Sequence, residues 1–192
     1  PGYYSVKLDD ENVLVELTTT ARAGMHRYTF PATDDANIII DLAHRDKLLD
    51  SSLNIKSATT VVGWRRSQAW AKNQIVYFAL EFSQPFTAHD SSEKKTYLRF
   101  DTRGGAPVLV KIGISAVGID GALKNLYTEI SDWNFDKVKS DAKAAWNAEL
   151  NKIVVSGGTA AQLTNFYTSL YHVMTVPNLR GEAISGRELA TA

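Results

Sequence analysis

The stretch PVLVKIGISAVGIDGALKNLYTEI, residues 107–130, changes its hydrophobic period in the middle, and this change points to the fold class. In the first half, apolar side chains recur at every second residue, as on one face of a β-strand. These residues are Val108, Val110, Ile112 and Ile114. In the second half they recur at three- and four-residue spacing, as on one face of a helix. These residues are Leu123, Leu126, Tyr127 and Ile130. We therefore predict that a β part ends, and an α part begins, shortly before Gly121.

Upstream of this stretch, short runs rich in β-branched and aromatic residues alternate with turn-forming residues, which is typical of strands. Eight segments are predicted to be strands: Tyr4–Leu8, Val13–Thr18, Met25–Phe30, Asn37–Leu42, Leu53–Trp64, Gln74–Ser83, Thr96–Asp101 and Pro107–Val117. No helical pattern separates them, so they favour an antiparallel β-sandwich over residues 1–118 rather than a parallel sheet.

Downstream, three helices are predicted, over residues 121–132, 134–155 and 159–175. Asp132-Trp133-Asn134 separates the first from the second, and Gly157-Gly158 ends the second. Thr159 and Gln162 have the spacing of a capping box at the start of the third. The third helix has an apolar stripe for which this chain offers no partner helix; it comprises Leu163, Phe166, Tyr167, Leu170, Tyr171 and Met174. Residues 180–192 lose this periodicity and are expected to form an irregular tail that need not be native sequence.

The composition excludes several classes of protein and site. The 192 residues contain 21 basic and 21 acidic side chains, so the chain lacks the positive excess that binding to nucleic acid or an anionic membrane requires. No apolar run approaches the roughly 18 to 20 residues that span a bilayer. The absence of Cys excludes disulfides, a thiol nucleophile and Cys-rich zinc sites. Because Cys-free proteins occur in the cytoplasm and outside it, the compartment stays open.

The sequence contains no motif for a metal site or for hydrolytic catalysis. The four histidines, His26, His44, His89 and His172, are scattered and have no ligand spacing. There is no Gly-x-Ser-x-Gly motif, and nothing marks two carboxyl groups as a catalytic pair. We therefore predict no metal site from the sequence, whereas a pair of catalytic carboxyl groups stays open.

The densest unusual cluster is Gly63-Trp64-Arg65-Arg66-Ser67-Gln68-Ala69-Trp70. Two Trp and two Arg within seven residues offer flat apolar faces beside forked hydrogen-bond donors, which suits stacking on a sugar ring. The alternative is that Trp64 and Trp70 anchor the core and the two Arg pair with carboxylates. The cluster by itself leaves both readings open.

Three groups of segments together resemble those of a known family. The first group is Ser67–Ala71 with Val76-Tyr77-Phe78 and Phe82–Phe86. The second is Val110–Ser115 with Ala145-Trp146-Asn147 and Leu150. The third is Phe166–His172 with Pro177-Asn178-Leu179. In this order the segments resemble glycoside hydrolase family 92, the calcium-dependent exo-acting α-mannosidases. The resemblance covers roughly residues 1 to 179 and is expected to end there, because Arg180-Gly181-Glu182-Ala183 replaces the Asp- and Gly-rich loop usual in the family.

The resemblance implies an N-terminal β-sandwich, a helical linker and an (α/α)6 catalytic toroid. On this view residues 1–118 are a sandwich without its earliest strands, 119–156 are the linker, and 157–179 contain the first toroid helix. It further implies an α-1,2-mannosidase that hydrolyses terminal α-mannosides of glycans with inversion of configuration. The implied partners are a mannose-containing glycan and the missing toroid. Calcium is implied for the parent enzyme and none for this piece.

The catalytic acid, the general base and the calcium ligands are expected downstream of the chain, so the piece is expected to be inactive alone. Trp64, Arg65 and Arg66 are candidates for substrate binding or for the interface between sandwich and toroid. His172 and Asn178 are expected to approach the site from the first toroid helix.

Two other functions remain open: a carbohydrate-binding β-sandwich module without catalysis, and a purely structural domain. The start at Pro1-Gly2-Tyr3-Tyr4 indicates an internal piece of a longer protein whose signal peptide lies upstream. The family implies a secreted or periplasmic bacterial enzyme.

Overall fold

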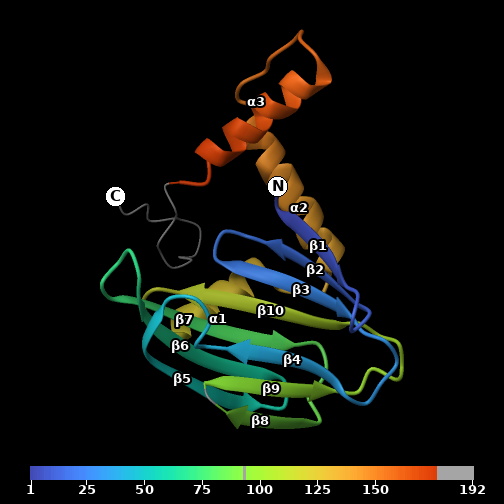
Figure 1. The fold of residues 1–192 in the computed structure, drawn as a ribbon, viewed down its shortest axis with the longest axis vertical. Coiled ribbons are helices and arrows are strands. Elements are labelled where there is room, and N and C mark those ends of the chain that lie inside the picture. The colour runs from blue at the N-terminus through green and yellow to red at the C-terminus, as the bar shows by residue number, and fades with distance from the viewer. Residues whose placement is uncertain (93, 177–192) are drawn as a thin grey trace.

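The computed structural model describes residues 1–92 and 94–176, and in them ten strands precede three helices (Figure 1). The strands are β1 (Tyr3–Leu8), β2 (Val13–Thr19), β3 (Ala23–Thr29), β4 (Ala36–Asp41), β5 (Lys47–Ser57), β6 (Thr60–Gln68), β7 (Gln74–Phe82), β8 (Ala88–Ser92), β9 (Lys95–Phe100) and β10 (Val108–Ser115). The helices are α1 (Ile119–Glu129), α2 (Phe135–Leu150) and α3 (Ala160–Val173). The prediction of a mainly β chain with C-terminal helices is confirmed.

The strands form two sheets whose neighbouring strands are all antiparallel in the described residues. Sheet A has seven strands in the order β1-β2-β3-β10-β7-β6-β5, and sheet B has three in the order β4-β9-β8. Sheet B covers part of one face of sheet A, as Figure 1 shows. This is the predicted antiparallel sandwich.

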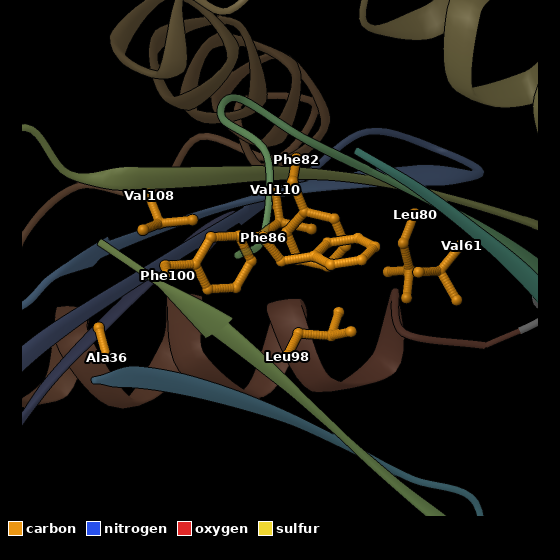
Figure 2. Close-up of a cluster of buried hydrophobic side chains, with 9 residues drawn as sticks. All are labelled: Ala36, Val61, Leu80, Phe82, Phe86, Leu98, Phe100, Val108 and Val110. Atoms are coloured by element: carbon orange, nitrogen blue, oxygen red, sulfur yellow. The ribbon is translucent and has the colours of Figure 1, made fainter. Parts of the chain in front are cut away.

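The main apolar core lies between the two sheets (Figure 2). Three aromatic rings meet there, with the Phe82 and Phe100 centroids 5.3 Å apart and Phe86 edge-on to both. The alternation predicted along residues 74–83 directs Leu80 and Phe82 into this core. Each large side chain that is fully buried here contributes on the order of 2 kcal/mol, so these residues hold the sheets together.

Two parts of the strand prediction are wrong. Residues 53–64 do not form one strand, because the chain reverses at Ala58-Thr59 between β5 and β6. The turn contains neither Gly nor Pro, and the Ser57 hydroxyl accepts from the Thr59 N–H at 3.2 Å. Strand β8 was also missed, because its sequence AHDSS lacks the apolar alternation of a half-buried strand.

Helices α1 and α2 cover the face of sheet A that points away from sheet B. Helix α1 approaches β10 closely because Gly113 has no side chain: a Cβ there would lie 2.1 Å from the Ala122 carbonyl oxygen and 2.7 Å from Leu126 Cβ. Ala122 and Leu126 pack on Val62 and Ala79 of the sheet. Helix α2 follows across β2 and β3, where Phe135 and Val138 join the cluster around Met25. Helices α1 and α2 are thus fixed to the sandwich by packing.

The helix boundaries follow local signals. Asn134 begins α2 by accepting from the Lys137 N–H at 3.0 Å, and Thr159 and Gln162 form the predicted capping box of α3. Helix α2 ends at Leu150 rather than at residue 155, since Asn151 already donates its N–H to the Asn147 and Glu149 carbonyls as the C-cap. Within the described ranges, no helix has the length and apolar character needed to cross a bilayer.

Substitution of Gly113 tests the contact between α1 and β10. Gly113→Ala should lower the free energy of unfolding by about 2 kcal/mol or more, because backbone atoms of α1 would have to move. Urea unfolding followed by circular dichroism measures the loss. Gly104→Ala is the matched control, since no atom lies within 4 Å of the added Cβ. Equal stability of the two variants would contradict this account.

Candidate functional site

The three candidate residues of β6, Trp64, Arg65 and Arg66, do not lie on the same face of sheet A. Val61 lies in the core between the sheets, whereas Val62 packs against α1. Because side chains alternate along a strand, Arg65 projects toward sheet B, and Trp64 and Arg66 project toward the α1 side. The residues therefore do not form one binding surface.

Arg65 organises the loop between β4 and β5. Its guanidinium donates to three backbone carbonyls, those of Leu42 at 2.8 Å and of His44 and Asp46 at 2.9 Å each. The Asp46 carboxylate lies 3.9 Å away and adds a weak ion pair. With its donors occupied and its side chain 20% exposed, Arg65 has a structural role in the described residues.

Arg66 and Trp64 lie on the face of sheet A against which α1 packs, but outside the area that α1 covers. Arg66 is exposed, and its Nε donates to Asn73 Oδ1 at 2.8 Å across the β6–β7 hairpin. Trp64 is half-buried between its register neighbours Ser52 and Tyr77. Trp70, at the hairpin tip, is 95% exposed, so the expectation that it could be a core anchor is wrong.

His172 lies in the last turn of α3 and is exposed. Its ring is 5.6 Å from that of Tyr171, and its carbonyl accepts from the Thr175 hydroxyl at 2.7 Å. Figure 1 shows α3 at the far end of α2 and apart from β6, so the fold does not bring these two elements together. Asn178, Pro177 and the expected tail lie outside the described residues.

A histidine–tyrosine pair that the sequence did not single out lies on the sheet B side of β3. His26 Nδ1 and Tyr28 Oη are 2.9 Å apart and share a hydrogen bond. Burial lowers the pKa of His26 to about 4 and raises the pKa of Tyr28 to about 12. Both groups are therefore neutral at pH 7. Alternation along β3 places them on one face, but their burial depends on neighbouring strands.

The described carboxyl groups with a shifted pKa are not suited to be the general acid of a glycosidase. Three have a shifted pKa, and in each it is lowered: Glu16 mainly by its hydrogen bond from Arg27, Asp41 by the Ala43 N–H, and Asp101 to about 2 by Arg103. A general acid needs a raised pKa instead. Residues 1–92 and 94–176 also contain no group of three or more His, Asp or Glu that could hold a metal ion.

The apolar stripe of α3, defined above, is only partly covered in the described chain: Phe166 is exposed and the other stripe residues are half-buried. None of the helix residues is buried, although the Tyr171 ring packs edge-on against Trp146 of α2, with 4.8 Å between centroids. A hollow of about 450 Å³ lies on one side of this contact. It is lined by Pro1, Leu150, Leu163, Thr164, Tyr167, Thr168 and Tyr171. This face has the composition of a helix–helix interface without its second half.

Two family models match the chain. Residues 1–115 match the glycosyl hydrolase family 92 N-terminal domain, and residues 121–187 match the catalytic domain of the same family. The first match alone covers more than half of the 192 residues. The second runs past Leu179, where the resemblance was expected to end, so that expectation is wrong.

Solved structures of the family have the same fold. A family GH92 α-mannosidase from Bacteroides thetaiotaomicron is 30% identical, with a TM-score of 0.84 over 95% of this chain and 28% of its own. That enzyme has also been solved in complex with mannoimidazole. A GH92 inverting mannosidase from the same species is 25% identical, with a TM-score of 0.81 over 93% of this chain and 26% of its own.

A curated relative from Arthroderma benhamiae is an uncharacterized secreted glycosidase. It is 26% identical over 218 residues, which cover 92% of this chain and 28% of the relative. The chain thus spans less than a third of the length of each of these relatives.

The neighbouring arginines of β6 give a matched pair of variants. Arg65→Met should lower the free energy of unfolding by about 2 kcal/mol, because three loop carbonyls lose their donor. Arg66→Met should change it by less than about 0.5 kcal/mol, since Arg66 is exposed. Urea unfolding of both variants measures the difference, and a larger loss for Arg66 would reverse the assignment.

His26 should make the fold sensitive to acid. Its pKa is about 4 in the folded chain and about 6.5 when unfolded, so its contribution is intact above pH 6.5 and is lost as the pH falls toward 4. The loss should reach roughly 3 kcal/mol at the low end. An NMR titration of the His26 ring measures the folded value directly. Tyr28→Phe should leave the pKa of His26 low, because burial is its cause. A His26 pKa of about 6.5 in the unchanged chain or in the variant would contradict this account.

Proposed function

Because the chain belongs to glycosyl hydrolase family 92, we propose that it is the N-terminal domain and the beginning of the catalytic domain of an inverting α-mannosidase. The whole enzyme releases terminal mannose from glycans, and α-1,2-linked mannose is the proposed substrate. Two structurally similar relatives at 30% and 25% identity are mannosidases, which supports this assignment. The secreted relative supports an exported enzyme.

In an inverting glycosidase, one carboxylic acid protonates the leaving oxygen while a carboxylate activates water on the opposite face of the sugar. The described carboxyl groups with shifted pKa values are held ionised by Arg27, Ala43 N–H and Arg103, so none is suited to be the acid. We therefore assign the catalytic acid and base to the part of the catalytic domain that relatives carry beyond this match. On this basis the chain has no hydrolytic activity by itself.

Calcium requires six to eight oxygen ligands, usually several of them from carboxylates. Because the described residues contain no group of three or more acidic or His side chains able to hold a metal, they do not fit a calcium site. The calcium ligands of the whole enzyme are therefore assigned to the same part of the catalytic domain as the acid and the base.

The proposed role of the chain is to fix the start of the catalytic domain in space. Residues 1–118 form the sandwich, 119–156 the linker, and 157–179 contain the first helix of the toroid. The observation that carries this division is the contrast between helices: α1 and α2 bury side chains on sheet A, whereas α3 buries none. An amphipathic helix needs a partner to be stable, and the other toroid helices would supply one.

Assays of the 192-residue chain and of a longer protein from the same gene test the proposal. The chain should not hydrolyse α-1,2-mannobiose. The longer protein should hydrolyse it, and NMR should first detect the released mannose as the β anomer, because the configuration is inverted. Hydrolysis by the chain alone would overturn the location of the catalytic groups. An inert longer protein would overturn the enzyme assignment, and millimolar or tighter binding of mannose by the chain would favour a carbohydrate-binding module.

A further inference from the structure

The hairpin between β6 and β7 presents a tryptophan that the sandwich does not use. Trp70 is 95% exposed, although Trp side chains are usually buried at least in part. Its neighbours Ala69 and Ala71 are small and apolar. A tryptophan held in water in this way is typical of a contact residue in an interface.

The hairpin holds this side chain in a defined position. The strands stay paired up to Ser67 and Gln74, and Arg66 Nε donates to Asn73 Oδ1 across the base at 2.8 Å. At the tip, the Ala69 N–H donates to the Ala71 carbonyl at 3.1 Å. A short turn fixed at its base loses little conformational freedom when it binds, which favours a preorganised contact.

Basic side chains surround the tip. Arg66 and Lys72 flank it in sequence, and Lys47 is the register partner of Gln68 on the neighbouring strand. Asp50 is paired with Arg66 in the register and is the nearest acidic position on β5. The surface around Trp70 therefore suits an apolar recess bordered by carboxylates.

Figure 1 shows the β6–β7 turn, in green, at the same side of the molecule as the red end of α3. The match to the catalytic domain continues past α3 to residue 187, and the matched structures are more than three times as long as this chain. The remaining catalytic domain of such a protein would continue from the end of α3, which lies on this side of the molecule.

We propose that Trp70 and its basic rim dock the sandwich onto the later part of the catalytic domain, as a second contact separate from the linker helices. This inference rests on the proposed function, because it requires that domain to be present. A sugar ring is the alternative binding partner for Trp70. Small-molecule sites are normally concave, and the hairpin contributes no residue to the lining of the hollow beside α3.

The test compares the 192-residue chain with the longer protein, both labelled with 5-fluorotryptophan. Trp70→Phe identifies the Trp70 signal in the ¹⁹F NMR spectrum, and a soluble gadolinium chelate reports its exposure. The signal should be strongly relaxed in the short chain and relaxed about fivefold less in the longer protein, where the interface excludes water. Trp133, whose ring centre lies 4.2 Å from Lys111 Nζ of the sheet, provides an internal reference signal.

A stability measurement provides an independent readout. Trp70→Ala should shift the unfolding temperature of the short chain by less than about 2 °C, because the side chain touches little there. In the longer protein the same variant should lower it by about 3 °C or more. Similar small shifts in both proteins would overturn the docking role.

The outcomes separate this inference from the proposed function. A longer protein that hydrolyses mannosides while Trp70 stays fully exposed would overturn the docking role alone. A protected Trp70 in a longer protein without mannosidase activity would support docking and overturn the enzyme assignment. A shift of the Trp70 signal in the short chain on adding α-1,2-mannobiose would assign the residue to sugar binding and overturn docking.

Discussion

The close contact between α1 and β10 is the constraint on which the helical part of the structure depends. Because Gly113 carries no side chain, the backbone of α1 lies directly on the sheet, and Leu126 and Ala122 reach Val62 and Ala79. The direction of α1 then determines where α2 crosses β2 and β3. Helix α3 follows α2 and packs against it through the contact between Tyr171 and Trp146. Any side chain at residue 113 would alter the path of everything that follows it.

Charged groups also hold the helices to sheet A, in addition to the apolar packing. Lys111 is only 3% exposed on the α1 side of β10, with its Nζ 2.9 Å from Glu81 Oε2 and 4.2 Å from the centre of the Trp133 ring. Arg22 Nε lies 2.7 Å from Glu129 Oε1 at the end of α1. Breaking such buried pairs leaves an uncompensated charge, so they resist sliding of the helices over the sheet. The two faces of sheet A thus differ: one is held by apolar packing against sheet B, and the other by packing together with oriented ion pairs.

The assignment of function comes from the family and the fold rather than from a site within the chain. The pKa of Asp101 is lowered to about 2, His26 is neutral and half-buried, and Arg65 supports a loop, so none of these three groups is suited to be the general acid of a glycosidase. What the described residues provide is geometry: a sandwich, two helices packed on it, and an amphipathic helix whose apolar side is only partly covered. This combination supports the proposal of a domain that positions a catalytic unit.

Local sequence determined the features that depend on neighbours along the chain. The change of period after β10, the break before Asn134 and the capping box at Thr159 were all predictable, because hydrophobic periodicity and caps act within a few residues. The hairpin at Ala58-Thr59 was not predictable, since hydroxyl hydrogen bonds replaced the usual Gly or Pro signal. Only the tertiary structure decided that Arg65 supports a loop, that Trp70 is exposed, that the pKa of His26 is lowered and that Gly113 must be small. The physical reason is that burial and close approach depend on which strands and helices pack against a residue, and those partners are distant in sequence.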